Sequence, residues 1–414
     1  MSKRPRPLRY AIALVAALTA VTVPASAAEG PAVAGGYDIV WDDFRAGFSH
    51  TGENAKWSLS PTGALPYGDG RPTTSASGLT VVPTGTDPAT GRPAFAFTGG
   101  QESAGGIGDG DHLKWYAVAN HRASTGVTGF DAVPGQVLTC RTQLASRTTG
   151  ADRHPFGTAV TDAQDDLRLG AGAMSVIDFE TNLVFDFFVT DERVHAFYER
   201  LPTPGSTYAA FSYALPVAPR DPGRRHDLAI AFDRAAGKAV WKVDGREVLA
   251  VDDLGHVPAD RSHLILDHGG TEETVSPRQL SCGIGMFTLL DAAGPDGRGL
   301  VRLSDRSDYY YDPARGAPRP ERFLDEASRP HNRLWGQGVK LQVGKVAIAS
   351  RPGTLRQPPT RRRRGGGIRP DGPDAAPARV RQDPDVAPYR AGARHFSSPA
   401  TKAANNDPAT GAST

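Results

Sequence analysis

Short runs in which apolar and polar residues alternate, separated by Gly, Pro, Asn and Asp, fill most of the chain. The clearest run spans residues 226–253, HDLAIAFDRAAGKAVWKVDGREVLAVDD, where Leu228, Ile230 and Phe232 alternate with smaller or polar residues. The Asp-Gly pair at 244–245 is typical of a two-residue hairpin turn. Because strand side chains point alternately to two faces, this segment predicts three antiparallel strands.

The same alternation predicts further strands along the chain. They are expected at residues 38–41, 79–82, 94–98, 137–144, 185–190, 193–200, 210–215 and 340–349. Amphipathic helical periodicity is almost absent, and no repeat of fixed length disturbs the pattern, which argues against a propeller or a solenoid. The pattern therefore predicts an all-β sandwich or barrel, with the irregular stretch 291–336 as a long connection on its surface.

The two ends of the chain differ from this central part. Residues 1–28 combine a basic start, an apolar run and an Ala-Ser-Ala cleavage site, which is typical of a secretory signal peptide. The apolar run is shorter than the ~20 residues that a membrane span needs. From residue 351 to 414 aromatic and β-branched residues almost vanish, which predicts a disordered basic tail. We expect a secreted, extracellular protein without a membrane span, in which residues 29–350 form one domain.

Charge is distributed unevenly along the chain. The chain carries a formal net charge of +2, but the leader contributes +4 and the tail +7, which leaves −9 on residues 29–350. An acidic domain argues against nucleic acid as a partner, because phosphate contacts need a cationic face. The Arg361–Arg364 run of the tail could hold an anionic polymer or serve only as a solvated linker.

The two cysteines of the chain, Cys140 and Cys282, could pair in an oxidising compartment. A disulfide requires the two Cα atoms to lie within about 7 Å of each other. The sequence does not place them, so pairing stays open at this point.

Four segments taken together point to a known architecture. They are FDFFVTDERVHAFYERLP, FSYALPVA, RRHDLAIAFDRAAGKAVWKVDGREVLAV and LQVGKVAIAS. Their succession resembles the strand order of concanavalin A-like lectin and glucanase jelly rolls, over roughly residues 137–349. The resemblance implies a jelly-roll β-sandwich of two antiparallel sheets, within an uncharacterised group of secreted proteins of this fold. It further implies a polysaccharide or glycan as the partner of what we expect to be a monomer.

The stretch SVIDFETNLVFDFFVT, residues 175–190, places three carboxylates inside one apolar run. Glucanases of the resembled superfamily carry a Glu-x-Asp-x-Glu strand, in which alternate residues line one cleft. Asp178 and Glu180 match the second and third positions of that motif, whereas Val176 stands where the nucleophile is needed. An aliphatic side chain cannot form the glycosyl ester, so the retaining mechanism does not transfer.

Three interpretations of these residues remain open: ordinary polar residues on a sheet edge, carbohydrate binding without turnover, and catalysis by a hydrolase or lyase with a degenerate motif. The candidate catalytic residues are Glu180, Asp178, Glu199 and His195. The candidate ligand contacts are Trp115, Tyr116, Asn182, Asp186 and Tyr198. Alternation places His195 and Glu199 on one face of their strand and Tyr198 on the other, so the three cannot serve one cleft.

Signals for cofactors are weak. Asp109 and Asp111 in the loop GGIGDGDH could hold calcium, although the fuller ligand series of an EF-hand is missing. The histidines show no HExxH spacing, so no cofactor is expected. The sequence favours a secreted carbohydrate-binding protein. The alternatives are a polysaccharide-degrading enzyme and an extracellular surface or matrix protein without catalysis.

Overall fold

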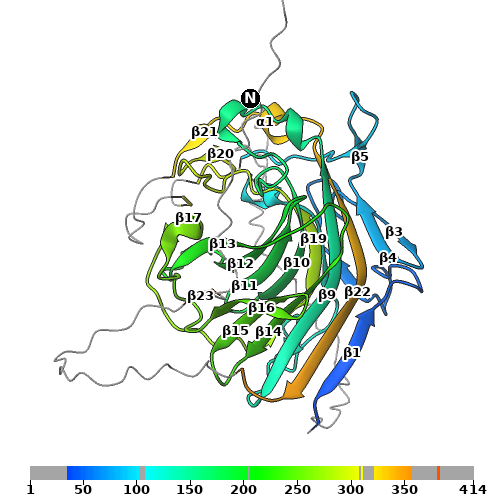
Figure 1. Cartoon of the computed structure of the whole chain (residues 1–414), viewed down its shortest axis with the longest axis vertical. Coiled ribbons are helices and arrows are strands. Elements are labelled where there is room, and N and C mark those ends of the chain that lie inside the picture. Colours follow the sequence, from blue (N-terminus) through cyan, green and yellow to red (C-terminus); the bar gives the residue numbers. More distant parts are fainter. Residues whose placement is uncertain are drawn as a thin grey trace, which may run out of the picture.

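Two antiparallel β-sheets stacked face to face make up the protein (Figure 1). The computed structural model describes residues 35–101, 108–203, 205–306, 309–310, 321–355 and 380–382. Within these ranges no helix has the length and apolar character needed to cross a bilayer. The prediction of an all-β sandwich with two antiparallel sheets is confirmed.

The nine-stranded sheet has the order β23-β16-β15-β14-β9-β22-β4-β3, and β1 also pairs with β22. Its strands are β1 (Tyr37–Asp42), β3 (Arg71–Ser75), β4 (Gly78–Val82), β9 (Gln136–Thr149), β14 (His226–Asp233), β15 (Lys238–Val243), β16 (Arg246–Val251), β22 (Gly338–Pro352) and β23 (Val380–Gln382).

The eight-stranded sheet has the order β17-β13-β12-β11-β10-β19-β7-β2. Its strands are β2 (Trp57–Leu59), β7 (Leu113–Ala119), β10 (Ala171–Asp178), β11 (Leu183–Val189), β12 (Arg193–Arg200), β13 (Ala210–Pro219), β17 (Leu264–Gly269) and β19 (Gly283–Phe287).

Short elements complete the fold at the margins of the two sheets. They are the pairs β5 (Gly85–Thr86) with β6 (Pro93–Ala94), β8 (Phe130–Asp131) with β18 (Gln279–Leu280) and β20 (Gly299–Val301) with β21 (Phe323–Asp325), the helix α1 (Pro330–Arg333), and 3-10 turns at Gly108–His112, Ala151–Arg153, Gly157–Ala159 and Arg261–His263.

The predicted meander at residues 226–253 is confirmed as β14, β15 and β16. Asp244 and Gly245 between the last two strands have φ angles of 52° and 82°. Positive φ at both central residues suits the right-handed twist of the flanking strands, and Asp-Gly tolerates it well.

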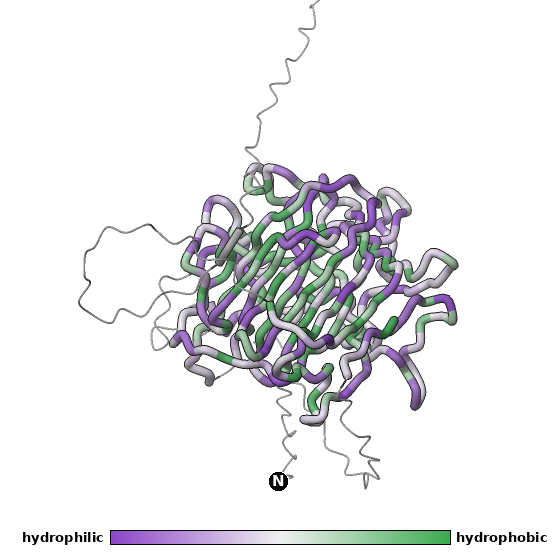
Figure 2. The backbone as a smooth tube through the Cα atoms, turned by 60° about the horizontal axis from the view of Figure 1, so that its bottom comes forward, coloured by the Kyte–Doolittle hydropathy of each residue, from purple (hydrophilic) through white to green (hydrophobic). Residues whose placement is uncertain are grey.

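The main core lies between the two sheets and is built around large rings. The fully buried residues there include Trp57, Trp115, Phe185, Tyr198 and Trp241. Apolar residues follow the strands, and hydrophilic residues are frequent in the surrounding loops (Figure 2). Burying such side chains stabilises the fold by roughly 1.5–3 kcal/mol each.

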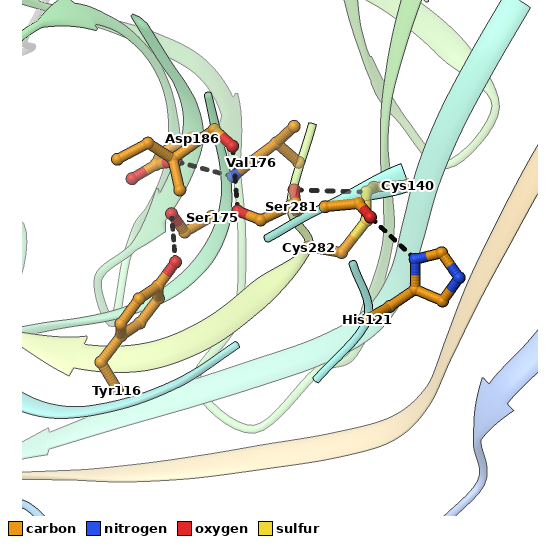
Figure 3. Close-up of a disulfide and its surroundings, with 10 residues drawn as sticks. Tyr116, His121, Cys140, Ser175, Val176, Asp186, Ser281 and Cys282 are labelled. Carbon is orange, nitrogen blue, oxygen red and sulfur yellow. Dashed lines mark hydrogen bonds between the residues drawn. A yellow bond between two sulfur atoms is a disulfide. The ribbon is translucent and has the colours of Figure 1, made fainter. Parts of the chain in front are cut away.

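One disulfide links the two sheets through this core (Figure 3). Cys140 belongs to β9 and Cys282 directly precedes β19, and their Cα atoms lie 6.1 Å apart. The sequence left this pairing open, and the fold provides it because β9 and β19 belong to facing sheets.

Two segments beyond residue 350 belong to the nine-stranded sheet. Strand β22 continues to Pro352, past the expected domain boundary at residue 350. Val380–Gln382 form β23, which pairs with β16 and extends the nine-stranded sheet by one strand. In the described part of the tail, these two segments have regular structure. Its other residues from 356 on, and the predicted signal peptide, lie outside the described residues.

The irregular stretch after β19 packs against the eight-stranded sheet on the face that points away from the nine-stranded sheet. We call that face of the eight-stranded sheet the outer face. A second apolar cluster there joins Phe188 and Phe197 of the sheet to Leu289 and Ala292 of the connection. The backbone N–H of Ala293 donates to Ile265 O at 2.8 Å. The connection thus covers part of the outer face, in keeping with its expected place on the sandwich surface.

Candidate functional site

A line of polar side chains crosses the outer face of the eight-stranded sheet. We call it the polar row, and its members are Tyr116 (β7), Ser175 (β10), Asp186 (β11), Glu199 (β12) and Ser212 (β13). In the register of the sheet, Ser175 pairs with Asp186 and Glu199 pairs with Ser212. Asp186 lies opposite Phe197, which makes Asp186 and Glu199 diagonal neighbours on adjacent strands. Side chains in this relation can interact.

A glycine allows Tyr116 to reach the next strand but one. A Cβ at Gly283 of β19 would lie 2.6 Å from the Tyr116 hydroxyl oxygen. Glycine avoids this steric clash because it has no side chain. The hydroxyl donates a hydrogen bond to Ser175 Oγ at 3.3 Å (Figure 3). Burial raises the pKa of Tyr116, so the hydroxyl keeps its proton and remains a donor.

Asp186 is almost completely buried, at 4% exposure. Its Oδ1 accepts a hydrogen bond from Val176 N at 3.0 Å, and its backbone carbonyl accepts one from Trp241 Nε1 at 2.9 Å. Burial and then the negative charge of Glu199 raise the pKa of Asp186 well above its ordinary value. The protonated form of this carboxyl is therefore favoured.

Glu199 is the one member of the polar row that is only half-buried. Burial raises its pKa to about 7, against the opposing effects of a hydrogen bond from the Ser212 hydroxyl and the charge of His112. A carboxyl with this pKa is present in both protonation states near neutral pH. It can accept a proton or a hydrogen bond in one state and donate in the other.

A second polar cluster adjoins the row and contributes to its electrostatics. His112 Nε2 lies 2.5 Å from Asp291 Oδ1, and the Tyr310 hydroxyl donates to Asp291 Oδ2 at 2.7 Å. Burial opposes ionisation of Asp291, but the charge and hydrogen bond of His112 outweigh it, so the pKa of Asp291 lies below its ordinary value. The Asp291 charge in turn raises the pKa of Glu199.

Sequence reasoning missed this second cluster. Asp291 and Tyr310 belong to the irregular connection, where no periodicity indicates direction, and His112 ends a 3-10 turn before β7. A histidine and an aspartate in distant loops carry no spacing signal that could have joined them.

Three of the residues named from the sequence come together in the polar row: Tyr116, Asp186 and Glu199. His195 shares the outer face with Glu199, as alternation predicts, but the buried Phe197 stands between them on β12. The His195 ring contacts Asp165 Oδ1 at 3.1 Å instead. Four strand positions span about 13 Å, so His195 belongs to a separate group.

Trp115 and Tyr198, both expected to contact a ligand, are fully buried between the sheets. The Tyr198 hydroxyl accepts a hydrogen bond from Gly255 N at 2.7 Å, which satisfies it inside the core. These two residues pack the sandwich, and in this conformation neither is open to a ligand.

Asp178 and Glu180 do not continue one strand, as the glucanase overlay requires. Strand β10 ends at Asp178, which is fully buried and accepts hydrogen bonds from Thr181 Oγ1 and Gln279 Nε2, each at 2.6 Å. Glu180 lies in the following turn and accepts a hydrogen bond from Arg278 Nε at 2.9 Å. That hydrogen-bonded pairing lowers the pKa of Glu180.

Asn182 belongs to the same turn and has a positive φ of 59°. Its Nδ2 donates to Thr203 Oγ1 at 2.9 Å and to the Tyr208 hydroxyl at 3.1 Å. Asp178, Glu180 and Asn182 thus hold the β10–β11 hairpin turn together, and they do not line up with the polar row.

The carboxylate expected to bind calcium is already paired. Asp111 Oδ1 lies 3.0 Å from Lys114 Nζ, with both side chains fully buried, and accepts a hydrogen bond from Gly99 N at 2.6 Å. The side chain of Asp109 lies outside the described residues. Among the residues that the structure does describe, no group of three or more His, Cys, Asp or Glu side chains could hold a metal ion.

A family model matches residues 41–352, a range that contains every strand except β23 and the first residues of β1. The chain belongs to DUF6081, a family of unknown function. It is also similar to the uncharacterized protein L829 of Acanthamoeba polyphaga mimivirus, at 32% identity over 194 residues. That match covers 33% of this chain and 45% of the viral protein, so the chain spans less than half the length of this relative.

Three solved structures to which the chain is similar at low sequence identity are a glucanase, a galactosidase and a carbohydrate-binding module. The β-glucanase of Bacillus licheniformis is 7% identical, with 77% of this chain and 99% of that chain covered and a TM-score of 0.32. The endo-β-galactosidase of Clostridium perfringens is 9% identical, with 80% and 64% covered and a TM-score of 0.34. The carbohydrate-binding module CBM66 of Bacillus subtilis is 10% identical, with 56% and 92% covered and a TM-score of 0.24.

Proposed function

We propose that this member of DUF6081 is a secreted glycan-binding protein whose site lies at the polar row. The observation that carries the proposal is the gathering of carboxyl and hydroxyl side chains from five strands, at opposite or diagonal positions, on the outer face. Sugar hydroxyls both donate and accept hydrogen bonds. A half-buried carboxyl with hydroxyl groups nearby can provide acceptors and donors for them.

Glu199 is the member that we assign to direct contact, because it is the most accessible to solvent. Asp186 and the Tyr116–Ser175 hydrogen bond lie deeper and would fix its surroundings. A disulfide in the core favours an oxidising compartment, which supports secretion together with the predicted signal peptide.

Glycan-array screening followed by calorimetry tests this proposal. We expect the wild-type protein to retain at least one class of polysaccharide, and Glu199→Gln to weaken that binding at least tenfold, since a hydrogen bond to a charged group is worth about 1.5–3 kcal/mol. Glu247→Gln is the matched control, because it removes an exposed carboxyl from β16 of the other sheet. No retention on the array, or equal losses in both variants, would remove the proposal.

A polysaccharide-cleaving enzyme is the second candidate, and the pKa of Glu199 near 7 is what favours it. In a hydrolase, Glu199 would donate a proton to the leaving oxygen of the glycosidic bond. In a lyase, Glu199 would accept a proton from a carbon of the sugar ring. The reaction would produce new reducing ends or unsaturated products, and Glu199→Gln would abolish them. A glycan that binds but is never cleaved leaves the binding proposal alone.

A further inference from the structure

A polar groove of about 440 Å³ lies on the nine-stranded sheet, which is not the sheet that bears the polar row. The side chains that matter for its chemistry are Asp43, Arg45, Ser77, Gln143, Arg225 and Lys345. They come from the residues that follow β1 and β3, from β9 and β22, and from the residue before β14.

The groove exists because β22 changes its neighbour part-way along. Residues 341–343 of β22 pair with β4, and residues 346–350 pair with β1, while β9 pairs along the other side. Gly344 and Lys345 form a bulge opposite Gln143 of β9, where the register shifts. The β3–β4 hairpin and β1 therefore diverge at the bulge, and the fork between them is open.

Gly344 lets two polar groups approach the backbone at this point. A Cβ at this position would lie 2.8 Å from Gln143 Oε1 and 3.2 Å from Arg225 Nη1. The amide of Gln143 and the guanidinium of Arg225 thus both lie close to the backbone of Gly344.

Positive charge predominates in the groove. Arg45, Arg225 and Lys345 face a single carboxylate, Asp43, which lies 3.7 Å from Arg45 Nε in a solvent-exposed pair. Arg225 and Lys345 are half-buried, and neither side chain has a hydrogen-bond or ion-pair partner among the residues that the structure describes. Partial loss of hydration without a counter-charge costs free energy, which an anionic ligand would offset.

We propose that this groove binds the carboxylate or sulfate group of an acidic polysaccharide. Its volume exceeds that of a small inorganic anion and suits one or two sugar rings. Ser77 and Gln143 can meet ring hydroxyls, while Val40 and Ala76 offer apolar contact to the C–H face of a ring. This site is independent of the polar row and does not rest on the function proposed for it.

Calorimetry on the whole protein tests the proposal with four probes: an oligogalacturonate, a sulfated oligosaccharide, a neutral oligosaccharide of equal length, and inorganic sulfate. The test variant is Arg225→Gln with Lys345→Gln. Its matched control is Arg224→Gln with Lys340→Gln, which removes the same charge from exposed residues that do not line the groove.

We expect one or both acidic oligosaccharides to bind with an affinity that falls as salt rises, and the neutral one to give no signal at this site. The test variant should bind the acidic probe at least tenfold more weakly, whereas the control should stay within twofold of wild type. The acidic probe that binds identifies the group as carboxylate or sulfate. Unchanged thermal unfolding of both variants would show that the fold is intact.

No binding of either acidic probe, equal binding by both double variants, or binding of inorganic sulfate alone would overturn the proposal. Its failure is distinguishable from failure at the polar row. Glu199→Gln should leave binding in the groove unchanged, and the Arg225/Lys345 variant should still bind a neutral glycan selected on the array.

Discussion

Replacing Glu199 by Gln tests the electrostatics of the polar row without any ligand. In the folded protein burial raises the pKa of Glu199 from the usual 4.5 to about 7. Unfolding returns the carboxyl to water and to its ordinary pKa. The folded state therefore holds this proton more tightly than the unfolded state, and the free energy of unfolding must depend on pH.

The sign and size of this effect follow from the two pKa values. Below pH 4.5 the carboxyl is protonated in both states, so its full contribution to stability is present. As pH rises towards 7 the unfolded state ionises first, and the contribution is lost by the time the pH has passed the folded pKa. At about 1.4 kcal/mol for each pKa unit, the total loss is about 3 kcal/mol.

Urea denaturation from pH 4 to pH 8 measures this difference. The side-chain amide of the Glu199→Gln variant cannot ionise, and its oxygen can still accept the Ser212 hydrogen bond, so the variant should lack this pH dependence. We expect the free energy of unfolding of Glu199→Gln, relative to wild type, to rise by about 3 kcal/mol between pH 4 and pH 8. Glu247→Gln serves as the control. A difference between wild type and Glu199→Gln that stays constant with pH, within about 0.5 kcal/mol, would refute the assignment of Glu199 to a desolvated site.

Three further predictions concern the core and the hairpin turn. Replacing Cys140 and Cys282 by Ala opens a loop of 142 residues, and the chain-entropy model predicts that the free energy of unfolding falls by about 5 kcal/mol. An unchanged midpoint of urea denaturation would contradict this prediction. Lys114→Met leaves the Asp111 carboxylate buried without its partner, and thermal unfolding should show a loss of about 3–5 kcal/mol, whereas a neutral result would mean that the pair is not buried. Glu180→Gln breaks a partly exposed ion pair, so stability should fall by less than about 1 kcal/mol and glycan titrations should match wild type. Loss of binding as large as that of Glu199→Gln would restore the site inferred from the sequence.

The three strands β14, β15 and β16 could be predicted from the sequence. Residues 226–253 combine clear alternation with an Asp-Gly turn, so local chemistry determines the three strands. In contrast, every residue of β10 and β11 is buried. With both faces covered, alternation does not tell which face meets the other sheet.

Alternation also leaves the register between strands undetermined. Alternation placed Glu199 and His195 on one face of β12. Only the pairing of β11 with β12 brings Asp186 beside Glu199. The contribution of Asp291 depends on the path of an irregular connection, which no periodic pattern describes. The overlay on the glucanase motif assumed one continuous strand through Asp178 and Glu180, whereas the chain turns after Asp178.

A crystal structure of the protein with an oligosaccharide selected on the array tests the central claim most directly. We expect a sugar on the outer face of the eight-stranded sheet, with a hydroxyl within about 3 Å of the Glu199 carboxyl. An oligosaccharide bound at the turn of residues 179–182, or elsewhere without contact to Glu199, would contradict it.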